Sequence, residues 1–412
     1  MIVNRRDFLK STVIFSMLTP LMKISGASGV EDKLIMERGR VSRKRFGDLT
    51  LPLLGFGTMR LPRKNGEIDM DAWRKLVKRA MDAGINYFDT AWFYMKGKSE
   101  NAVAEALSSY PRESYFLADK LPVRSIRSKE DAERIFEKQL EKCRTGYFDF
   151  YLLHALNKKN WETVKKFDLI NFVEEKRKQG KIRHIGFSFH DAPEVLLEIV
   201  NAHKWDFVQL QINYVDWEAY RSGEQYKIAT DAGLPVIVME PLKGGTLANV
   251  PDKVKKMLTG IHPGTTPAQW AFRYAGSLPN VLTVLSGMSA MEHLEENIRT
   301  FSPFRKLVTR DKRILDSAVE VYRNNKLIPC TACSYCIPCP ADVNIPQIFR
   351  KFNDYKNDGD TGKLKNSLAA LSAKGEGIDA CVKCGACMKR CPQQIRIVEE
   401  FAMISQLLKE AK

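Results

Sequence analysis

The chain has 412 residues, of which 44% are hydrophobic and 28% are charged. It is long enough for two or three domains, or for one large barrel with an appendage, and it is too apolar to be wholly disordered. It contains no uninterrupted apolar run of about 20 residues, which excludes a polytopic membrane protein. The net charge of +16 is spread along the chain, and clusters such as Lys176, Arg177 and Lys178 lie in amphipathic helix patterns, so we interpret them as solvated helix faces and not as a nucleic-acid-binding patch.

The first 28 residues have the features of a bacterial export signal. The arginine pair Arg5–Arg6 precedes an apolar stretch over 11–22, and small residues at 25–27 offer a cleavage site. The pair resembles the twin-arginine signal, which exports folded, cofactor-loaded proteins. We therefore expect 1–28 to be a targeting segment, 29–45 to be a linker, and the protein to be exported to the periplasm or cell surface. The alternatives are an uncleaved signal that anchors the protein in the membrane and an N-terminal helix of a cytoplasmic enzyme.

Strand-like and helix-like patterns alternate from residue 46 to residue 300. After a short hairpin over 45–52, the predicted strands are 53–58, 85–90, 115–120, 148–154, 182–188, 207–213, 235–240 and 281–286. The predicted helices are 69–84, 99–109, 128–143, 167–180, 191–202, 222–232, 267–276 and 290–300. Eight such units in about 250 residues predict a (β/α)8 barrel, which we assign to 46–310. No Gly-x-Gly-x-x-Gly follows the first strand, which argues against a Rossmann domain.

Polar residues stand at the ends of three consecutive predicted strands. Asp89 ends the second strand, with Tyr94 five residues later, Lys120 ends the third, and His154 ends the fourth. A barrel gathers these strand ends at one mouth. A phenol has a pKa of about 10, which a nearby ammonium would lower, while a carboxylate would hold that ammonium in place. Each residue alone has an ordinary structural explanation, but together they favour proton transfer to a carbonyl oxygen as hydride arrives, or the reverse.

The segment 46–300 resembles the aldo/keto reductases. The matching phrases are Gly55-Phe-Gly-Thr-Met59, Asn86-Tyr-Phe-Asp-Thr-Ala91 with Tyr94, Ala118-Asp-Lys-Leu-Pro122, Asp149-Phe-Tyr-Leu-Leu-His154, Ile185-Gly-Phe-Ser188, Val208-Gln-Leu-Gln211, Glu240-Pro-Leu-Lys-Gly244 and Glu295-Glu-Asn297. The resemblance implies a nicotinamide cofactor, a small carbonyl or alcohol substrate, and Tyr94 as general acid/base assisted by Asp89, Lys120 and His154.

The resemblance also implies where the nicotinamide dinucleotide binds. The corresponding positions are Gly57, Thr58 and Met59 after the first strand, Ser188 and Gln209 for the carboxamide, Leu242, Gly287 and Met288 in later loops, and Glu296 and Asn297 at the adenine end. The choice between NAD and NADP stays open, because Gly287–Met288 and His293 replace the residues that often grip the 2′-phosphate. The alternative is that these positions serve packing and turn geometry.

Four aromatic residues lie on the loops of the same predicted mouth. They are Trp92, Phe93, Tyr214 and Trp217. We predict that they wall an apolar substrate pocket, with loop packing as the alternative.

Eight of the nine cysteines lie in two runs near the C-terminus. The runs are Cys330-Thr-Ala-Cys333-Ser-Tyr-Cys336-Ile-Pro-Cys339-Pro340 and Cys381-Val-Lys-Cys384-Gly-Ala-Cys387-Met-Lys-Arg-Cys391-Pro392. Three cysteines spaced two residues apart bind one iron–sulfur cluster, and the fourth, before proline, reaches the other. We therefore assign one 4Fe–4S cluster to Cys330, Cys333, Cys336 and Cys391, and a second to Cys339, Cys381, Cys384 and Cys387. Zinc sites and disulfides are the alternatives, and the isolated Cys143 is interpreted as a buried structural residue.

The C-terminal region is predicted to be a helical connector over 311–329 and a small helical iron–sulfur domain over 330–412, with helices near 345–353, 364–373 and 397–408 and a loop over 357–362. The arrangement resembles the aldo/keto reductase subgroup with a C-terminal iron–sulfur domain. We expect a redox enzyme whose barrel exchanges hydride and whose clusters pass single electrons to a partner protein. The alternatives are structural clusters, or an electron-transfer or redox-sensing protein whose barrel binds nucleotide without turnover.

Overall fold

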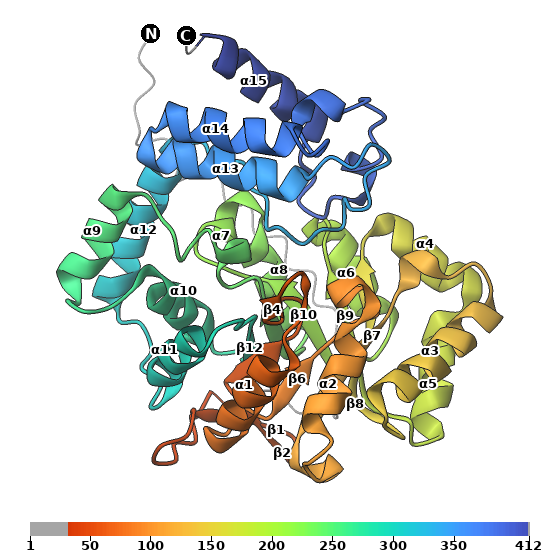
Figure 1. The fold of residues 1–412 in the computed structure, drawn as a ribbon. Helices are drawn as coiled ribbons and strands as arrows, with labels where there is room; N and C mark the ends of the chain where they lie inside the picture. Colours follow the sequence, from red (N-terminus) through yellow and green to blue (C-terminus); the bar gives the residue numbers. More distant parts are fainter. Residues whose placement is uncertain (1–31, 411–412) are drawn as a thin grey trace, which may run out of the picture.

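The computed structural model describes residues 32–410, so the predicted targeting segment 1–28 lies outside the described residues. Eight parallel strands close into a barrel in the order β10-β11-β12-β3-β6-β7-β8-β9. They are β3 (Leu54–Gly57), β6 (Tyr87–Asp89), β7 (Phe116–Leu121), β8 (Phe148–Leu156), β9 (Ile182–Phe189), β10 (Phe207–Gln211), β11 (Val236–Met239) and β12 (Val281–Ser286). The predicted (β/α)8 barrel is confirmed, with helices surrounding the strands (Figure 1).

The eight predicted barrel helices are all present. They are α1 (Met70–Asp82), α2 (Ser99–Leu107), α3 (Lys129–Cys143), α5 (Leu169–Lys178), α6 (Pro193–Ala202), α8 (Ser222–Asp231), α10 (Pro267–Gly276) and α11 (Met291–Phe301). Three further helices, α4 (Lys158–Phe167), α7 (Asp216–Ala219) and α9 (Asp252–Ile261), lie in stretches where no helix was predicted. Helix α9 fully buries only Val254 and Leu258, and two apolar positions make a weak periodic signal.

One end of the barrel is closed by an N-terminal hairpin. Strands β1 (Arg43–Phe46) and β2 (Leu49–Pro52) pair antiparallel, and β1 begins inside the segment predicted as a linker. Phe46 and Leu51 pack on the side chains that fill the barrel interior, among them Phe150 and Phe207. The opposite end, where the strands finish, is therefore the end available for chemistry. A second hairpin, β4 (Arg63–Lys64) with β5 (Glu67–Ile68), follows β3.

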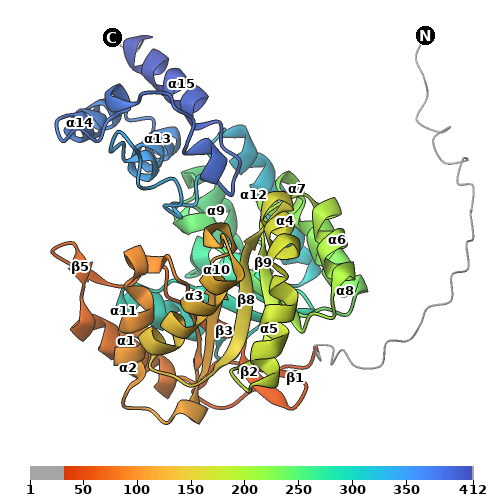
Figure 2. The same cartoon turned by 90° about the vertical axis from the view of Figure 1, so that its right-hand side faces the viewer.

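The C-terminal region lies over that open end. Helix α12 (Thr309–Asn324) packs against α9, and α13 (Ile345–Asp358), α14 (Thr361–Ser372) and α15 (Ile397–Glu410) follow. Figures 1 and 2 both place these last three helices beyond the barrel end that lies opposite the β1–β2 hairpin. Their own core includes Phe349, Phe352 and Phe401. The predicted loop over 357–362 is too long, since only residues 359–360 separate α13 from α14. Gly359 adopts a left-handed φ of 74° that ends α13, and α14 starts two residues later.

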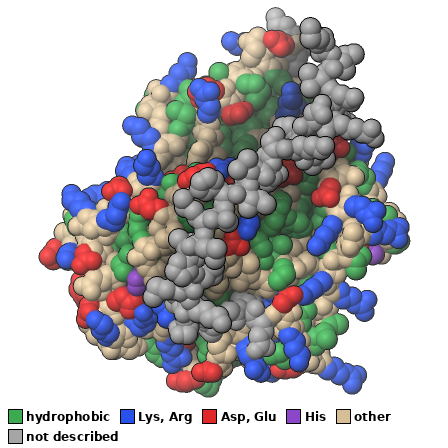
Figure 3. Space-filling model, turned by 180° about the vertical axis from the view of Figure 1, so that it is seen from behind, with side chains coloured by type: hydrophobic (Ala, Val, Ile, Leu, Met, Phe, Trp, Pro, Cys, Tyr) green, Lys and Arg blue, Asp and Glu red, His purple; other side chains and the backbone are tan. Residues whose placement is uncertain are grey.

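The surface carries both signs of charge. Figure 3 shows basic and acidic side chains intermixed over the face behind the view of Figure 1. The basic cluster on α5 is paired, since Lys176 contacts Glu133, Arg177 contacts Glu174 and Lys178 contacts Glu175 at 2.5–2.7 Å. No helix within residues 32–410 has the length and apolarity needed to span a membrane.

The remaining elements are short 3₁₀ helices that shape loops. They are η2 (Tyr94–Gly97), η3 (Arg112–Ser114), η4 (Val123–Ser125), η5 (Lys243–Gly245), η6 (Ile378–Ala380) and η7 (Met388–Arg390). Two of them matter for the site, because η2 carries Tyr94 and η5 meets the iron–sulfur domain.

Candidate active site

The four predicted catalytic residues meet at the open end of the barrel. The Lys120 Nζ lies 2.6 Å from Asp89 Oδ1 and donates to the Thr90 carbonyl at 2.7 Å. The same ammonium stands 5.0 Å from the centre of the Tyr94 ring. The rings of Tyr94 and His154 are 6.1 Å apart and nearly perpendicular. All four side chains are buried, which makes the Lys120–Asp89 pair a desolvated charge pair beside a phenol and an imidazole.

Strand alternation explains which of two adjacent polar residues enters the site. Successive side chains of a strand point to opposite faces, so Lys120 on β7 faces the barrel interior while Asp119 faces outward. Asp119 accordingly meets Cys143 of α3, with Sγ and Oδ2 3.7 Å apart. Cys143 is buried there, as predicted from its place at a helix end.

His154 is aimed into the mouth by an irregularity in β8. The register with β9 shifts between Leu153 and Leu156, and Ala155 has a φ of 56°. Such bulges redirect side chains near active sites. The amide of Ala155 donates to the Ser188 hydroxyl at 2.8 Å, so Ser188, predicted as a cofactor residue, also holds the turned backbone beside His154.

Burial decides the protonation of the two aromatic acid–base groups. It raises the pKa of Tyr94 well above its ordinary value, and Tyr335, Asp89 and Glu240 add to the rise. The expected lowering of this pKa is wrong in direction, because desolvation by burial is the largest cause of its shift. Burial, reinforced by Lys120 and Arg124, holds the pKa of His154 well below its ordinary range. Near neutrality the site therefore presents a protonated phenol next to an uncharged imidazole.

A cavity of about 170 Å³ opens onto these residues. From the barrel it is lined by Gly57, Met59, Arg60, Asp89, Tyr94, His154, Ser188, His190, Gln209, Met239, Glu240, Pro241, Leu242, Gly244, Gly245, Leu285, Ser286 and Gly287. The iron–sulfur domain contributes Thr331, Cys333, Tyr335, Pro392 and Gln393 to the same cavity. Asp89, Tyr94 and His154 thus face a space that two domains enclose together, and Lys120 lies behind Asp89.

The predicted aromatic wall is wrong, because none of its four residues lines this cavity. Trp92 packs under Lys142, with the ammonium 4.7 Å from the ring, and Phe93 packs under Arg124 at 4.0 Å. Tyr214 and Trp217 both pack against Tyr274. The loops turn these rings toward neighbouring elements, and Tyr335 adds an aromatic side chain from the other domain to the cavity that Tyr94 lines from the barrel.

The predicted cofactor positions divide into two groups. Gly57, Met59, Ser188, Gln209, Leu242 and Gly287 line the cavity, whereas Thr58, Met288, Glu296 and Asn297 do not. The second group makes structural contacts. The Thr58 hydroxyl donates to the Asp89 carbonyl at 2.9 Å, the Asn297 amide donates to the Ser286 hydroxyl at 3.0 Å, Glu296 bonds the Thr266 hydroxyl, and Met288 is fully buried.

The residues around the cavity fit a nicotinamide dinucleotide. Ser188 and Gln209 present a hydroxyl and an amide beside Tyr94, which suits a carboxamide that both donates and accepts hydrogen bonds. Gly57 and Gly287 both line the cavity and carry no side chain, so bare backbone faces the space where a ligand would bind. Helix α11 begins just beyond, with no side chain capping its first amides, which leaves donors for a phosphate.

The eight C-terminal cysteines gather in two sets drawn from both runs. After the dominant effect of burial, Cys391 adds to the raised pKa of Cys330, Cys333 and Cys336. Burial likewise raises the pKa of Cys387, and there the added contributions come from Cys381 and Cys339. A hollow lined by Cys339, Cys381, Cys384 and Cys387 also includes Cys336. These contributions join the same thiols as the assignment made from the spacing, and Cys336 borders both sets. Which cluster each thiol binds stays a prediction.

These sets fit iron–sulfur clusters better than zinc. Within residues 32–410, no three His, Cys, Asp or Glu side chains converge as closely as the ligands of one metal ion. Four thiolates that bind four different irons of a cubane stand farther apart than four ligands of a single zinc. All nine cysteines are free thiols in the structure.

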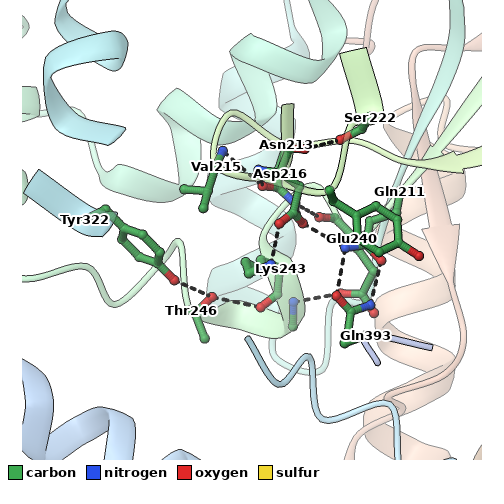
Figure 4. Close-up of polar contacts among 12 residues, drawn as sticks. Gln211, Asn213, Val215, Asp216, Ser222, Glu240, Lys243, Thr246, Tyr322 and Gln393 are labelled. Carbon is green, nitrogen blue, oxygen red and sulfur yellow. Dashed lines mark hydrogen bonds and ion pairs between the residues drawn. The ribbon is translucent and has the colours of Figure 1, made fainter. Parts of the chain in front are cut away.

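Specific contacts hold the iron–sulfur domain on the barrel. Gln211 and Gln393 exchange two amide hydrogen bonds of 3.1 and 2.7 Å (Figure 4). Gln211 is fixed from below by Asp216, which accepts from its amide at 2.7 Å and pairs with the buried Lys243 at 2.5 Å. Gln393 follows Cys391 by two residues, so this network ties the fourth cysteine of the first set to the end of β10.

Two further contacts involve Thr331, which lies next to Cys330. The Arg60 guanidinium donates to the Thr331 carbonyl at 2.6 Å. Gly244, with a φ of 67°, lies so close to the Thr331 backbone that a Cβ would overlap it. Sequence reasoning did not identify Arg60, His190, Tyr335 or Gln393. Of these only Tyr335 carried a signal, as the one aromatic residue between the cysteines of the first run.

Comparisons with known proteins agree with this geometry. The aldo/keto reductase family profile matches residues 53–320, and the 4Fe–4S dicluster domain profile matches residues 329–395. The chain is 25% identical over 303 residues to the uncharacterised oxidoreductase YqkF of Bacillus subtilis, covering 66% of this chain and 93% of the relative. It is 26% identical over 302 residues to the NADH-specific methylglyoxal reductase of Escherichia coli, covering 61% and 90%.

A solved structure of an aldo-keto reductase has a similar fold. The holo form of an aldo-keto reductase from Bacillus halodurans superposes with a TM-score of 0.55 at 24% identity, covering 69% of this chain and 96% of that one. The family match spans well over half of the chain and includes all four residues of the buried site. The protein therefore belongs to the aldo/keto reductase family and carries a C-terminal 4Fe–4S dicluster domain.

Proposed function

We propose that the protein transfers hydride between a nicotinamide cofactor, NAD or NADP, and a small carbonyl or alcohol substrate, and that its two clusters carry single electrons between this site and a partner protein. The observation that supports the proposal most directly is one shared cavity. Tyr94 and His154 line it from the barrel, and Cys333 of the first cysteine set lines it from the other domain.

The residues of the barrel have distinct parts in carbonyl reduction. When bound, a nicotinamide cofactor would supply the hydride that the carbonyl carbon accepts. Tyr94 gives its proton to the carbonyl oxygen, and the nearby Lys120 ammonium stabilises the phenolate that remains. Asp89 holds the ammonium at 2.6 Å. The uncharged His154 orients the oxygen by a hydrogen bond. In alcohol oxidation each transfer runs in reverse.

The two cysteine sets form a path from the cavity to the surface. Cys333 belongs to the inner set, and Cys336 of that set also borders the hollow of the second set. At the outer end Cys384 is exposed, and its neighbour Val382 is 68% exposed. Because a hydride carries two electrons and each cluster takes one, two adjacent clusters match the stoichiometry of nicotinamide oxidation.

The outer end favours a partner of negative charge. Lys383, Lys389 and Arg390 flank the second set, and no Asp or Glu occurs between residues 380 and 398. Basic side chains around an exposed redox centre steer an acidic protein toward it. We expect Lys383→Glu with Lys389→Glu to slow electron transfer to an acidic bacterial ferredoxin by about 10-fold at low salt. The matched control is Lys78→Glu with Lys227→Glu on α1 and α8 of the barrel, and equal slowing by both pairs would contradict the assignment.

The central experiment separates an enzyme from a redox module that binds nucleotide without turnover. Protein purified without air is analysed for iron, absorbance and bound nucleotide, and NADH and NADPH oxidation is then followed with methylglyoxal as probe. An enzyme loses this reaction on Tyr94→Phe and keeps cluster reduction by dithionite. Absence of carbonyl reduction in the wild type, with intact cluster reduction, would favour the module.

Export is a separate proposal that rests on the arginine pair Arg5–Arg6 and the apolar stretch after it. Outside the cytoplasm no pool of free nicotinamide is expected, so we propose that the nucleotide is retained or is recycled through the clusters. Retention at a nanomolar dissociation constant corresponds to about −12 kcal/mol. The test is cell fractionation, followed by denaturation of the mature protein and mass spectrometry of any released nucleotide. A cytoplasmic location refutes export, and an exported protein free of nucleotide that exchanges it rapidly refutes retention.

A further inference from the structure

The first cysteine run places a second phenol in the active site. Tyr335 lies between Cys333 and Cys336, and its hydroxyl is 2.9 Å from His154 Nε2. Both residues line the catalytic cavity. The contact joins the iron–sulfur domain directly to a residue of the barrel's acid–base group, across 181 positions of sequence.

His154 stands between two phenol rings that meet it in the same way. The Tyr94 ring is 6.1 Å from the imidazole at an interplanar angle of 81°, and the Tyr335 ring is 6.1 Å away at 79°. Only Tyr335 has a hydrogen bond to the imidazole. The imidazole tautomer sets the roles in this contact: with its proton on Nε2, the neutral His154 donates to the Tyr335 oxygen, and the phenol proton stays available for another acceptor.

Neighbouring groups hold Tyr335 in place. The Arg124 guanidinium lies 4.8 Å from the Tyr335 ring and 4.0 Å from the Phe93 ring, so it is packed between the two. On either side of Tyr335 the backbone leads to a cysteine of the first set. The cavity keeps a volume of about 170 Å³ with Tyr335 present, so the side chain forms part of the wall and does not fill the space.

We propose that Tyr335 is a catalytic residue supplied by the iron–sulfur domain, whose hydroxyl donates a hydrogen bond to the substrate oxygen, in addition to Tyr94 and His154, during reduction at Tyr94. The inference rests on the proposed carbonyl reduction. As hydride reaches the carbonyl carbon, the π bond to oxygen breaks and negative charge develops on the oxygen. Tyr94 transfers its proton there, while Tyr335 keeps its own proton and no bond to it is made or broken. When the substrate oxygen enters, His154 turns its hydrogen bond from Tyr335 to that oxygen, and each further donor aimed at the developing charge stabilises it more.

This arrangement makes the active site depend on the second domain. The barrel alone supplies Tyr94, Lys120, Asp89 and His154, but the Tyr335 hydroxyl reaches the cavity only when the first cysteine run is folded and docked. A role for the first cluster follows that does not require electron transfer: it fixes the loop that carries a substrate-binding hydroxyl.

The test is Tyr335→Phe in the full-length, iron-loaded protein, which removes the hydroxyl and keeps the ring that packs on Arg124. Methylglyoxal is the probe, with NADH and with NADPH. We expect kcat to fall by about 10- to 100-fold, which is no more than the loss seen when an enzyme loses one oxyanion donor. The nucleotide dissociation constant and the iron content should not change. Unchanged kcat overturns the proposal, and so does a higher kcat with a lower KM for methylglyoxal, which would mean that the hydroxyl competes with the substrate.

The matched control is Tyr220→Phe. The Tyr220 hydroxyl donates to the Pro392 carbonyl at 3.3 Å, so this variant also loses one hydrogen bond between the domains, but Tyr220 itself does not line the cavity. Equal losses in the two variants would reduce Tyr335 to a docking contact and overturn the proposal. If the wild type turns over and Tyr94→Phe does not, yet Tyr335→Phe behaves as wild type, the inference fails while the proposed function stands. If the wild type reduces no carbonyl with either nucleotide, both fail.

Discussion

Lys120 and Asp89 form an ion pair of 2.6 Å in which the lysine side chain has no exposure to solvent and the aspartate side chain has 3%. A buried ion pair is weak evidence for stability in itself, but removing one partner leaves an uncompensated charge. The second oxygen of Asp89 accepts from the Gln209 amide at 3.0 Å, so the carboxylate stays fixed when the lysine is lost.

We expect Lys120→Met to destabilise the protein by about 3–5 kcal/mol, as measured by chemical denaturation of the barrel. The double variant Lys120→Met with Asp89→Asn removes both charges and should recover part of the loss. A single variant as stable as the wild type would mean that the pair is not desolvated.

Tyr94→Phe should lower the turnover of any accepted carbonyl by at least about 100-fold, the low end for general acid catalysis. The reason is that the phenol proton is lost while the ring and its packing remain. The matched control is Tyr322→Phe, whose hydroxyl contacts the Thr246 hydroxyl outside the cavity. Steady-state kinetics at a saturating nucleotide concentration measure the effect, and near wild-type turnover would remove Tyr94 from the mechanism.

The crossed arrangement of the cysteines predicts which cluster a single substitution damages. Full occupancy should give about eight irons per chain. Cys391→Ser should impair the cluster of Cys330, Cys333 and Cys336, because Cys391 lies with that set and not with its own run. Iron analysis with electron paramagnetic resonance of the reduced protein tests this, using Cys384→Ser for the other cluster. Identical spectra for the two variants would contradict the crossing.

Acid should destabilise the protein partly through His190. Burial lowers the pKa of His190 from 6.5 to about 4, so the folded protein keeps it neutral while the unfolded chain binds a proton below pH 6.5. The contribution to stability is therefore complete above that pH and is lost as the pH falls toward 4.

Comparison of variants isolates this effect. Between pH 6.5 and 4, His190→Gln should show a shallower fall in the free energy of unfolding than the wild type, by up to about 1.4 kcal/mol per pH unit. The exposed His293→Gln serves as control. Parallel curves for wild type and His190→Gln would show that His190 titrates normally in the folded protein.

Gly244→Ala should loosen the iron–sulfur domain from the barrel, because the new methyl overlaps the Thr331 backbone. Gly245→Ala is a matched control, since Gly245 also has a positive φ of 101° but nothing within 4 Å of a built Cβ. Hydrogen exchange at residues 330–340 and 391–395 should rise in the first variant only. A similar rise in both would assign the effect to backbone strain in the loop.

Much of the architecture follows from local patterns in the sequence. Apolar runs at strand length, separated by helical periodicity, predict eight repeating units. Asp89, Lys120 and His154 stand at three successive predicted strand ends, and Tyr94 lies on the loop after the first of them. These inferences hold because side-chain direction along a strand and the meeting of parallel strand ends at one mouth are consequences of backbone geometry. The spacing of the eight cysteines is local in the same sense, since a three-residue step sets which thiols one cluster can reach.

Only the tertiary structure decided what surrounds those groups. The sequence suggested that Trp92 and Trp217 line the pocket, but long-range packing turns them toward Lys142 and Tyr274. Tyr335 from the other domain lines the pocket instead. The direction of the pKa shift of Tyr94 likewise depends on how much solvent the folded chain removes and not on the nearest charge alone. Local sequence determines which residues stand at strand ends and in the loops that carry the cysteines. Burial and domain docking depend instead on many contacts between residues far apart in the chain, and a pattern of neighbouring residues does not encode those contacts.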